Sequence, residues 1–401
     1  MIGKNCGTAI LAVFSRAGSP CHDCGAKYSS YIFHDMGDAN DYLLTVENLK
    51  TYFPIKKGLL RRTAGHIRAV DGVSFSIKRG QTLGLVGESG CGKTTVARTI
   101  VRLIPATAGW FDKLTMRINE TKNPEPVEGR VVFNEVDVLS ADKNKLRQLR
   151  KDISLIFQDT YGSLNPRMTV GSIIGEPLKV HRVATNGEVT ERVVALLSKV
   201  GLAGDHIDRY PHEFSGGQRQ RIGIARALAL APKLIICDEP VSALYVSIQA
   251  QILNLLKDLQ EEFGLTYLFI AHDLAVVDFF CDVVAVMYMG RIVEQASAEK
   301  LCRNPLHPYT RALMSAIPQI GVPPRHSRAA LGCESLDWLG IVRLSQNDGE
   351  LVEPMPSALN PPVGCTFGPR CSLAGPDCLS RMPPLAESSD RKGHFVACWK
   401  C

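Results

Sequence analysis

A glycine-rich loop near residue 90 restricts the possible folds of this chain more than any other feature. It follows an apolar run, Thr82 to Val86, and ends in Lys93 and Thr94. Glycines let consecutive backbone N–H groups surround a phosphate, and a helix beginning near the lysine adds the positive end of its dipole. A glycine-rich turn alone is usually only a turn, but the preceding strand pattern and the Gly-Lys-Thr ending predict a P-loop. The residues expected to bind a nucleoside triphosphate are Gly87, Glu88, Ser89, Gly90, Cys91, Gly92, Lys93, Thr94 and Thr95.

A second site for phosphate is predicted well downstream of this loop. Ser215 suits the N-cap of an alanine-rich helical stretch, and the two glycines after it let backbone amides approach an anion. Since the first loop serves the chain's own nucleotide, the second is best explained as contacting a nucleotide held by another subunit in a head-to-tail dimer. The residues expected to make this contact are Ser215, Gly216, Gly217 and Gln218. The octapeptide that contains them, after a P-loop, resembles the signature of ATP-binding-cassette (ABC) proteins.

Two acids follow the apolar run that starts at Leu234. Such a run is typical of a buried parallel strand, and ligands of open α/β sheets bind at the carboxyl ends of the strands. By resemblance to ABC proteins, Asp238 is the aspartate that holds Mg²⁺ through water, and Glu239 is the carboxylate that polarises the attacking water. His272, at the end of the next apolar run, matches the switch histidine that contacts the γ-phosphate.

Two further positions match the nucleotide site of the same family. Gln158 follows the apolar run from Ile153 and matches the Q-loop glutamine, which touches Mg²⁺ and relays closure to the membrane subunits. Tyr52 matches the aromatic residue on which adenine stacks, with Phe53 and a purely structural role as open alternatives, because stacking requires only a flat π-face. The expected catalytic set is Lys93, Gln158, Glu239 and His272, and the expected Mg²⁺ set is Thr94, Gln158 and Asp238.

The segments between these motifs narrow the resemblance to the oligopeptide and dipeptide (peptide/nickel) ABC importers. Four segments are similar to these proteins: residues 51–58, 69–75, 158–170 and 240–251. The combination of Gly-Gln-Arg-Gln-Arg with Pro-Val-Ser is typical of the second of their two non-identical ATPase subunits. The resemblance implies an α/β fold, namely a P-loop NTPase cassette that has a RecA-like parallel-sheet core, an antiparallel β subdomain and a helical subdomain.

The same resemblance implies the reaction, the location and the partners of the protein. It would hydrolyse ATP with Mg²⁺ at the cytoplasmic face of the cell membrane, as a peripheral subunit that energises uptake of peptides. Its partners would be a second, non-identical ABC ATPase (or a second copy of itself), two transmembrane permeases and, indirectly, a solute-binding protein. Nickel or another small solute is an alternative cargo, because the ATPase does not touch the cargo.

One residue departs from the family pattern. The family has Asp in the D-loop after Ser-Ala-Leu, where this chain has Tyr245. A phenol removes a charged acceptor and adds bulk at the dimer seam, so a catalytically impaired regulatory subunit is the alternative interpretation. Because Glu239 and His272 are both present, we favour a working ATPase.

Charge, repeats and hydrophobicity argue against three other classes of protein. The net charge of +6 comes from 46 basic and 40 acidic residues that are not gathered into one run, so nucleic-acid binding is not indicated. A soluble ABC protein acting on DNA or ribosomes usually has a second cassette or long coiled coils. The sequence shows neither a second cassette nor a sustained heptad pattern, so this class is not favoured. No segment approaches the roughly 18 apolar residues of a membrane-spanning helix, so membrane association is expected through partners.

The chain divides into four predicted parts. The cassette is expected at residues 41–320, with the helical subdomain at about 160–225 and a surface insertion at 106–128. Residues 321–350 are expected to form a linker and 351–401 a C-terminal extension. Residues 1–40 have no counterpart in the family, and we expect translation to start at Met36; intact mass of the natively expressed protein tests this.

The C-terminal extension is rich in cysteine. Four cysteines in a short proline-containing tail favour a metal site over disulfides in a protein of cytosolic type. In the peptide-importer ATPases that this tail resembles, such a quartet can hold an iron–sulfur cluster. Zinc is the rival, because tetrahedral thiolate sites suit both, and a set of free thiols is the third possibility. Since the wide spacings match no short zinc motif, a [4Fe–4S] cluster is slightly favoured. The four residues are Cys365, Cys371, Cys378 and Cys398.

Overall fold

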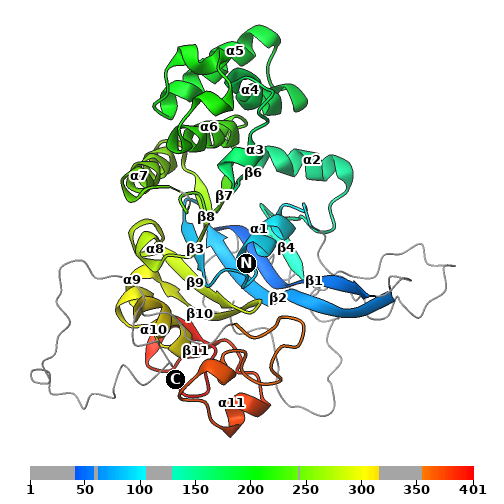
Figure 1. The fold of residues 1–401 in the computed structure, drawn as a ribbon, viewed down its shortest axis with the longest axis vertical. Coiled ribbons are helices and arrows are strands. Elements are labelled where there is room, and N and C mark those ends of the chain that lie inside the picture. The colour runs from blue at the N-terminus through cyan, green and yellow to red at the C-terminus, as the bar shows by residue number, and fades with distance from the viewer. Residues whose placement is uncertain (1–40, 58–61, 105–128, 243, 316–354) are drawn as a thin grey trace, which may run out of the picture. The chain divides into compact units, whose positions relative to one another are not determined.

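The computed structural model describes residues 41–57, 62–104, 129–242, 244–315 and 355–401. The expectations for residues 1–40, for the insertion at 106–128 and for the linker at 321–350 therefore lie outside the described residues. The described residues form an α/β fold with two sheets (Figure 1).

The larger sheet carries the predicted nucleotide motifs. Its five parallel strands are buried, apolar and flanked by helices, which explains why each reads as a continuous hydrophobic run. Its strand order is β11-β12-β10-β9-β3-β8-β7-β6. The parallel strands are β3 (Thr82–Val86), β6 (Ile153–Ile156), β7 (Leu234–Asp238), β8 (Thr266–Ala271) and β9 (Val283–Tyr288). The antiparallel strands are β10 (Arg291–Ser297), β11 (Ala386–Ser388) and β12 (Arg391–Val396).

The register of the parallel strands brings the motifs to one edge. Val86 pairs with Ala271 on β8, and Asp238 pairs with Ile270 on the same strand. The P-loop, the acid pair and His272 follow the carboxyl ends of these neighbouring strands. The sheet therefore gathers segments that are widely separated in the sequence.

The smaller sheet is antiparallel, with the order β2-β1-β4-β5. Its first two strands form a long antiparallel pair, in which Val46 lies opposite Phe75. The strands are β1 (Tyr42–Lys57), β2 (Arg62–Lys78), β4 (Arg130–Phe133) and β5 (Val136–Asp137). Together with α1 (Lys93–Ile100), this sheet covers one side of the larger sheet through a shared apolar core. The P-loop helix ends at Ile100, and two residues later the backbone of Arg102 takes a positive φ of 53°.

Helices between β6 and β7 form a second group, drawn at the top of Figure 1, and their apolar core is continuous with that of the larger sheet. A capping box of Thr185 and Glu188 starts α5, so the sequence itself marks that boundary. These helices are α3 (Thr160–Ser163), α4 (Val170–Val180), α5 (Asn186–Lys199) and α6 (Gly216–Leu228), and α2 (Lys143–Asp152) precedes β6. Two short 3₁₀ turns, Gly204–Asp208 and Pro211–Glu213, connect α5 to α6.

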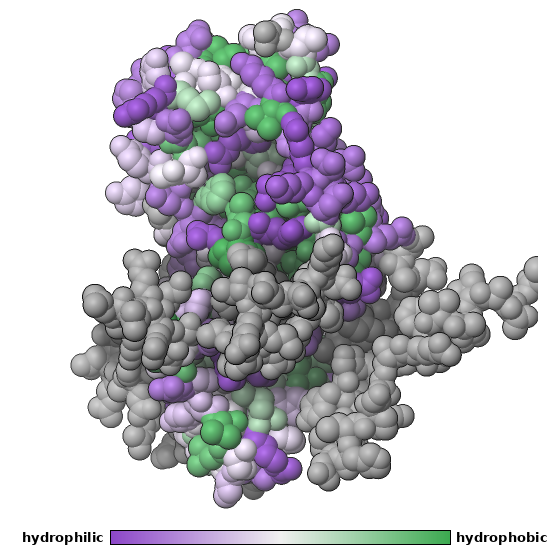
Figure 2. Space-filling model, turned by 90° about the vertical axis from the view of Figure 1, so that its right-hand side faces the viewer, coloured by the Kyte–Doolittle hydropathy of each residue, from purple (hydrophilic) through white to green (hydrophobic). Residues whose placement is uncertain are grey.

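The remaining helices follow the later strands. They are α7 (Val246–Phe263), α8 (Leu274–Phe280), α9 (Ala298–Arg303), α10 (Pro308–Ser315) and, in the C-terminal extension, α11 (Pro376–Ser380). In the part of the chain that the structure describes, no helix combines the length and the apolar character required to cross a bilayer. Hydrophilic side chains cover most of the visible face over the helical group, as Figure 2 shows.

The C-terminal extension continues the larger sheet. Strand β12 pairs with β10, with Val396 opposite Glu294. The His394 ring lies 2.6 Å from a carboxylate oxygen of Glu294, and both side chains are fully buried. The extension therefore shares the core of the cassette.

Candidate functional site

The P-loop depends on close backbone approaches that only glycine allows. Gly92 has φ of 111°, and a Cβ at this position would lie 2.1 Å from the carbonyl oxygen of Ala69. A Cβ on Gly87 would lie equally close to the carbonyl oxygen of Met287. Alanine at either position would force the backbone to move, because Cβ atoms do not approach carbonyl oxygens so closely. Of the other loop residues, Ser89 and Gly90 are exposed and Cys91 is buried.

Lys93 lies buried at the start of α1. Its ammonium group donates to the carbonyl oxygens of Gly87 (2.7 Å) and Glu88 (3.1 Å) and lies 3.9 Å from a carboxylate oxygen of Glu239. These carbonyls belong to the loop predicted to hold phosphate. The amine is thus positioned at the loop, where a bound triphosphate would offer it a stronger, charged acceptor.

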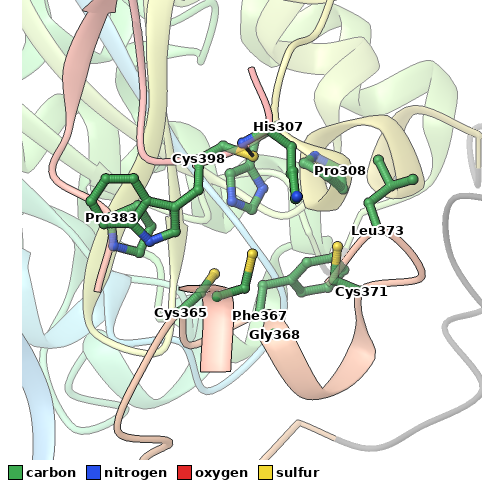
Figure 3. Close-up of a pocket in the computed structure, with 12 residues that line it drawn as sticks. His307, Pro308, Cys365, Phe367, Gly368, Cys371, Leu373, Pro383 and Cys398 are labelled. Atoms are coloured by element: carbon green, nitrogen blue, oxygen red, sulfur yellow. Dashed lines mark hydrogen bonds between the residues drawn. The ribbon is translucent and has the colours of Figure 1, made fainter. Parts of the chain in front are cut away.

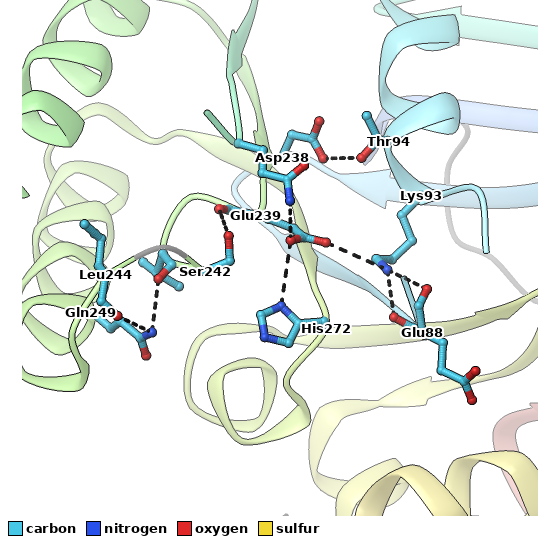
Figure 4. Close-up of polar contacts among 12 residues, drawn as sticks. Glu88, Lys93, Thr94, Asp238, Glu239, Ser242, Leu244, Gln249 and His272 are labelled. Atoms are coloured by element: carbon cyan, nitrogen blue, oxygen red, sulfur yellow. Dashed lines mark hydrogen bonds and ion pairs between the residues drawn. The ribbon is translucent and has the colours of Figure 1, made fainter. Parts of the chain in front are cut away.

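Thr94 and Asp238 come together from α1 and β7, as the sequence predicts. The Thr94 hydroxyl donates to Oδ1 of Asp238 at 2.8 Å (Figure 4). Oδ2 of Asp238 is buried and has no hydrogen-bond partner among the described residues. Burial raises the pKa of Asp238, and the hydrogen bond from Thr94 partly opposes this. An orphaned carboxylate oxygen beside a hydroxyl is suited to Mg²⁺ and its water ligands, so the donor set fits the expected ion.

Glu239 is the meeting point of three other predicted residues. Gln158 donates through Nε2 to Oε2 of Glu239 at 2.8 Å, and Nδ1 of His272 lies 3.8 Å from the same oxygen. The backbone of Glu239 has φ of 48°, which is uncommon outside glycine and is typical of functional sites. This conformation turns the carboxylate toward Lys93 and His272, as Figure 4 shows. The other three residues of the predicted catalytic set therefore surround the Glu239 carboxylate.

The signature segment starts α6 with a capping box. The N–H of Ser215 donates to Oε1 of Gln218 at 3.0 Å, and the N–H of Gln218 donates to the Ser215 hydroxyl at 3.4 Å. Gly217 packs against α7, since a Cβ there would lie 2.6 Å from Ile248. In the described residues no hydrogen bond or ion pair joins this segment to the chain's own P-loop. Ser215 and Gly216 are exposed, so the free amides of the first turn are open to a ligand from outside the chain.

Tyr52 lies on β1, outside this cluster of polar contacts. Its hydroxyl donates to Asp71, which also forms an ion pair with Arg291 at 2.7 Å. The ring is partly exposed and its edge is fixed by this network. Stacking of adenine on Tyr52 therefore stays a prediction.

Tyr245 is 87% exposed at the N-cap of α7, in the segment predicted to be the D-loop. It forms no side-chain cap, and Gln249 instead holds the segment through the carbonyl oxygens of Val241 (3.0 Å) and Leu244 (2.9 Å). An exposed phenol is available to a partner surface and leaves the local fold intact.

The four cysteines of the C-terminal extension line one small pocket. Figure 3 shows Cys365, Cys371 and Cys398 around the space that the His307 ring also borders. Burial raises the pKa of the Cys371 thiol to about 11. Among the described residues, however, no group of three or more His, Cys, Asp or Glu side chains is close enough to hold a metal ion. The pocket gathers the predicted ligands without placing them at the spacing of a single ion.

Two residues that contact Glu88 of the P-loop give no signal in the sequence: Tyr309 on α10 and Arg370 in the C-terminal extension. The N–H of Glu88 donates to the Tyr309 hydroxyl at 2.8 Å, and Nη1 of Arg370 lies 3.1 Å from each oxygen of the Glu88 carboxylate. These partners are separated by 221 and 282 residues, so no local pattern could have shown them.

Two family profiles match the chain. The profile described as "ABC transporter" matches residues 70–242. The profile described as "Oligopeptide/dipeptide transporter, C-terminal region" matches residues 293–334 and 341–378, which include three of the four cysteines.

Curated relatives cover almost the whole chain. Oligopeptide transport ATP-binding protein AppF of Bacillus subtilis (strain 168) is 48% identical over 357 residues, which is 89% of this chain and 96% of the relative. Oligopeptide transport ATP-binding protein OppF of Salmonella typhimurium is 48% identical over 361 residues, with the same coverage. Dipeptide transport ATP-binding protein DppF of Haemophilus influenzae is 42% identical over 360 residues, or 90% of this chain and 97% of the relative.

Solved structures share the cassette. The cbiO1 protein of Clostridium perfringens, part of the ABC transporter complex cbiONQ, has a TM-score of 0.52 and 26% identity, covering 66% of this chain and 92% of that chain. The cassette MJ0796, in a dimeric post-hydrolysis state with ADP and phosphate, has a TM-score of 0.52 and 27% identity, covering 64% of this chain and 98% of that chain. The predicted fold class is confirmed.

Proposed function

This chain belongs to the ATP-binding proteins of ABC transporters, in the oligopeptide and dipeptide branch, and from that membership we propose that it hydrolyses ATP to energise an importer of peptides. The observation that carries the proposal is the convergence of Lys93, Gln158 and His272 on Glu239 beside the Thr94–Asp238 pair. The peptide cargo is supported by the names of the relatives.

The reaction is in-line attack of water on the γ-phosphate of ATP. Lys93 would exchange its carbonyl acceptors for the β- and γ-phosphates, and Glu239 would orient the attacking water. Gln158 donates a hydrogen bond to the Glu239 carboxylate and His272 lies 3.8 Å from it, so both side chains would face the γ-phosphate beside Glu239. Mg²⁺, held by Thr94, Asp238 and Gln158, would neutralise charge on the phosphates.

The signature segment is proposed to complete the site of a partner. Ser215 and Gly216 are exposed and make no contact with the chain's own loop within the described residues, which supports a head-to-tail dimer with another ATPase subunit, non-identical or a second copy. Donors from Ser215 to Gln218 would then reach the partner's γ-phosphate. The dimer would drive two permeases at the cytoplasmic face of the membrane, with a solute-binding protein delivering the cargo.

An assay of ATP hydrolysis tests the proposed activity. The transporter purified with its partners is reconstituted in vesicles, and phosphate release is compared between wild type and Glu239→Gln. Loss of the water-orienting carboxylate should lower the rate about a hundredfold or more. Glu261→Gln, an exposed change on α7, is the matched control and should match wild type. Equal rates for wild type and Glu239→Gln would instead support the regulatory subunit that Tyr245 suggests.

The cargo is tested in the same vesicles. Labelled oligopeptides should be taken up by the vesicles only when both ATP and the solute-binding protein are supplied. Uptake of nickel without uptake of any peptide would overturn the peptide assignment.

We also propose that the four-cysteine pocket holds a [4Fe–4S] cluster. A cluster is larger than a single ion, which suits thiols that share a pocket but lie too far apart for one metal. Anaerobic purification followed by iron, sulfide and zinc analysis tests this. Iron and sulfide should be present and should fall in Cys371→Ser, with Cys302→Ser as a control outside the pocket. Zinc alone, or neither metal, would contradict the cluster.

A further inference from the structure

An ion pair ties the C-terminal extension to the phosphate-binding loop. Arg370 ends a short 3₁₀ turn, Gly368–Arg370, directly before Cys371 in the wall of the cysteine pocket. Its guanidinium lies 3.1 Å from both carboxylate oxygens of Glu88, the second residue of the P-loop. The same nitrogen donates to the Tyr288 hydroxyl at 3.2 Å.

This pair is not an ordinary surface contact. The side chain of Arg370 is 3% exposed and that of Glu88 is 24% exposed. Arg370 also lies over the rings of Tyr288 and Phe367, with its central carbon 5.7 Å and 5.9 Å from their centroids. Because water screens such a pair poorly, the charge of each partner depends on the other for compensation.

The loop next to Glu88 is the part of the chain that must accept a triphosphate. Glu88 carries the only acidic side chain between Gly87 and Thr95, and its own carbonyl oxygen accepts from Lys93 at 3.1 Å. The carboxylate points away from Asp238 and Glu239, as Figure 4 shows. An unpaired carboxylate on this loop would repel the phosphates and compete for Lys93.

We propose that Arg370 is a positioning residue that neutralises Glu88 and keeps its carboxylate away from the phosphates, so that the C-terminal extension controls the affinity of the site for ATP. This inference rests on the proposed function, because it concerns the same nucleotide site. A second contact supports it: the Tyr309 hydroxyl accepts the N–H of Glu88 and lies against the same aromatic cluster.

Equilibrium binding of a fluorescent ATP analogue to the full-length protein with Mg²⁺ tests the proposal. Arg370→Gln leaves Glu88 uncompensated and should weaken binding about tenfold, which corresponds to about 1.4 kcal/mol. The loss should shrink at high salt, because screening weakens the repulsion. Glu88→Gln leaves the positive charge of Arg370 without its partner beside the loop and should bind ATP about threefold more tightly than wild type. The double variant Glu88→Gln/Arg370→Gln should recover to within about twofold of wild type.

Arg391→Gln is the matched control, since this arginine belongs to the same extension, is exposed and donates to the carbonyl oxygen of Asn304 at 2.9 Å. It should bind ATP as wild type does. Equal binding by Arg370→Gln and wild type would overturn the inference. So would a double variant as weak as Arg370→Gln, which would show a purely structural role.

Failure of this inference can be told apart from failure of the proposed function. If wild type binds no ATP, the proposed function itself fails. If Arg370→Gln does not fold by circular dichroism, Glu88→Gln and the double variant carry the test, and weakened binding in both would contradict the charge argument.

Discussion

Truncation of Phe367 should remove much of the stability that the C-terminal extension adds to the cassette. The side chain is fully buried in the core cluster that also contains Val86 of β3. Its ring packs edge-on against Tyr288, with centroids 5.4 Å apart at 89°, and lies 5.4 Å from the ring of Tyr309. Phe→Ala in a core costs about 3–5 kcal/mol, and each lost aromatic pair accounts for roughly 0.5–1.5 kcal/mol of that. We expect Phe367→Ala to lower the free energy of unfolding by about 4 kcal/mol.

Urea denaturation followed by far-UV circular dichroism measures this change. The matched control is Phe279→Ala on α8, where the ring is 54% exposed and contacts Lys257 through a cation–π interaction at 5.5 Å. The control should lose no more than about 1 kcal/mol. A loss below about 1 kcal/mol for Phe367→Ala would refute the reasoning, because the extension would then contribute no shared core.

Two further changes test individual residues. Tyr245→Asp supplies the missing N-cap of α7 and should raise the free energy of unfolding by about 1 kcal/mol, seen as a higher melting temperature; an unchanged or lower melting temperature would contradict this. Burial by itself raises the pKa of Asp71, but the hydrogen bond from Tyr52 and the charge of Arg291 lower it overall, below 3.8. Because the folded-state pKa is depressed, the stabilisation is complete above about pH 5 and is lost as the pH falls through the folded-state value, so unfolding of Asp71→Asn should depend less on pH between about 5 and 2. An equally steep acid dependence in that variant would contradict the assignment.

Local sequence predicted the parts of the site that single segments form. The apolar run that ends before His272 is strand β8 (Thr266–Ala271), because a strand buried on both faces is continuously apolar. The N-cap at Ser215 was also predicted, and the structure shows that it is half of a capping box with Gln218, three residues away. Arg370 and Tyr309 were not, because a contact across hundreds of residues depends on how strands and helices pack.

The sequence by itself determined that this chain binds a nucleoside triphosphate, since glycines and a lysine at fixed spacing after a buried strand specify that loop. Only the tertiary structure decided how the distant parts meet. The register of β7 beside β8 places Glu239 next to His272, and the packing of Arg370 on Tyr288 of β9 brings its guanidinium to the P-loop. The physical reason is range: turns and caps form between neighbours in the chain, whereas sheet pairing and buried ion pairs depend on the closure of the whole core.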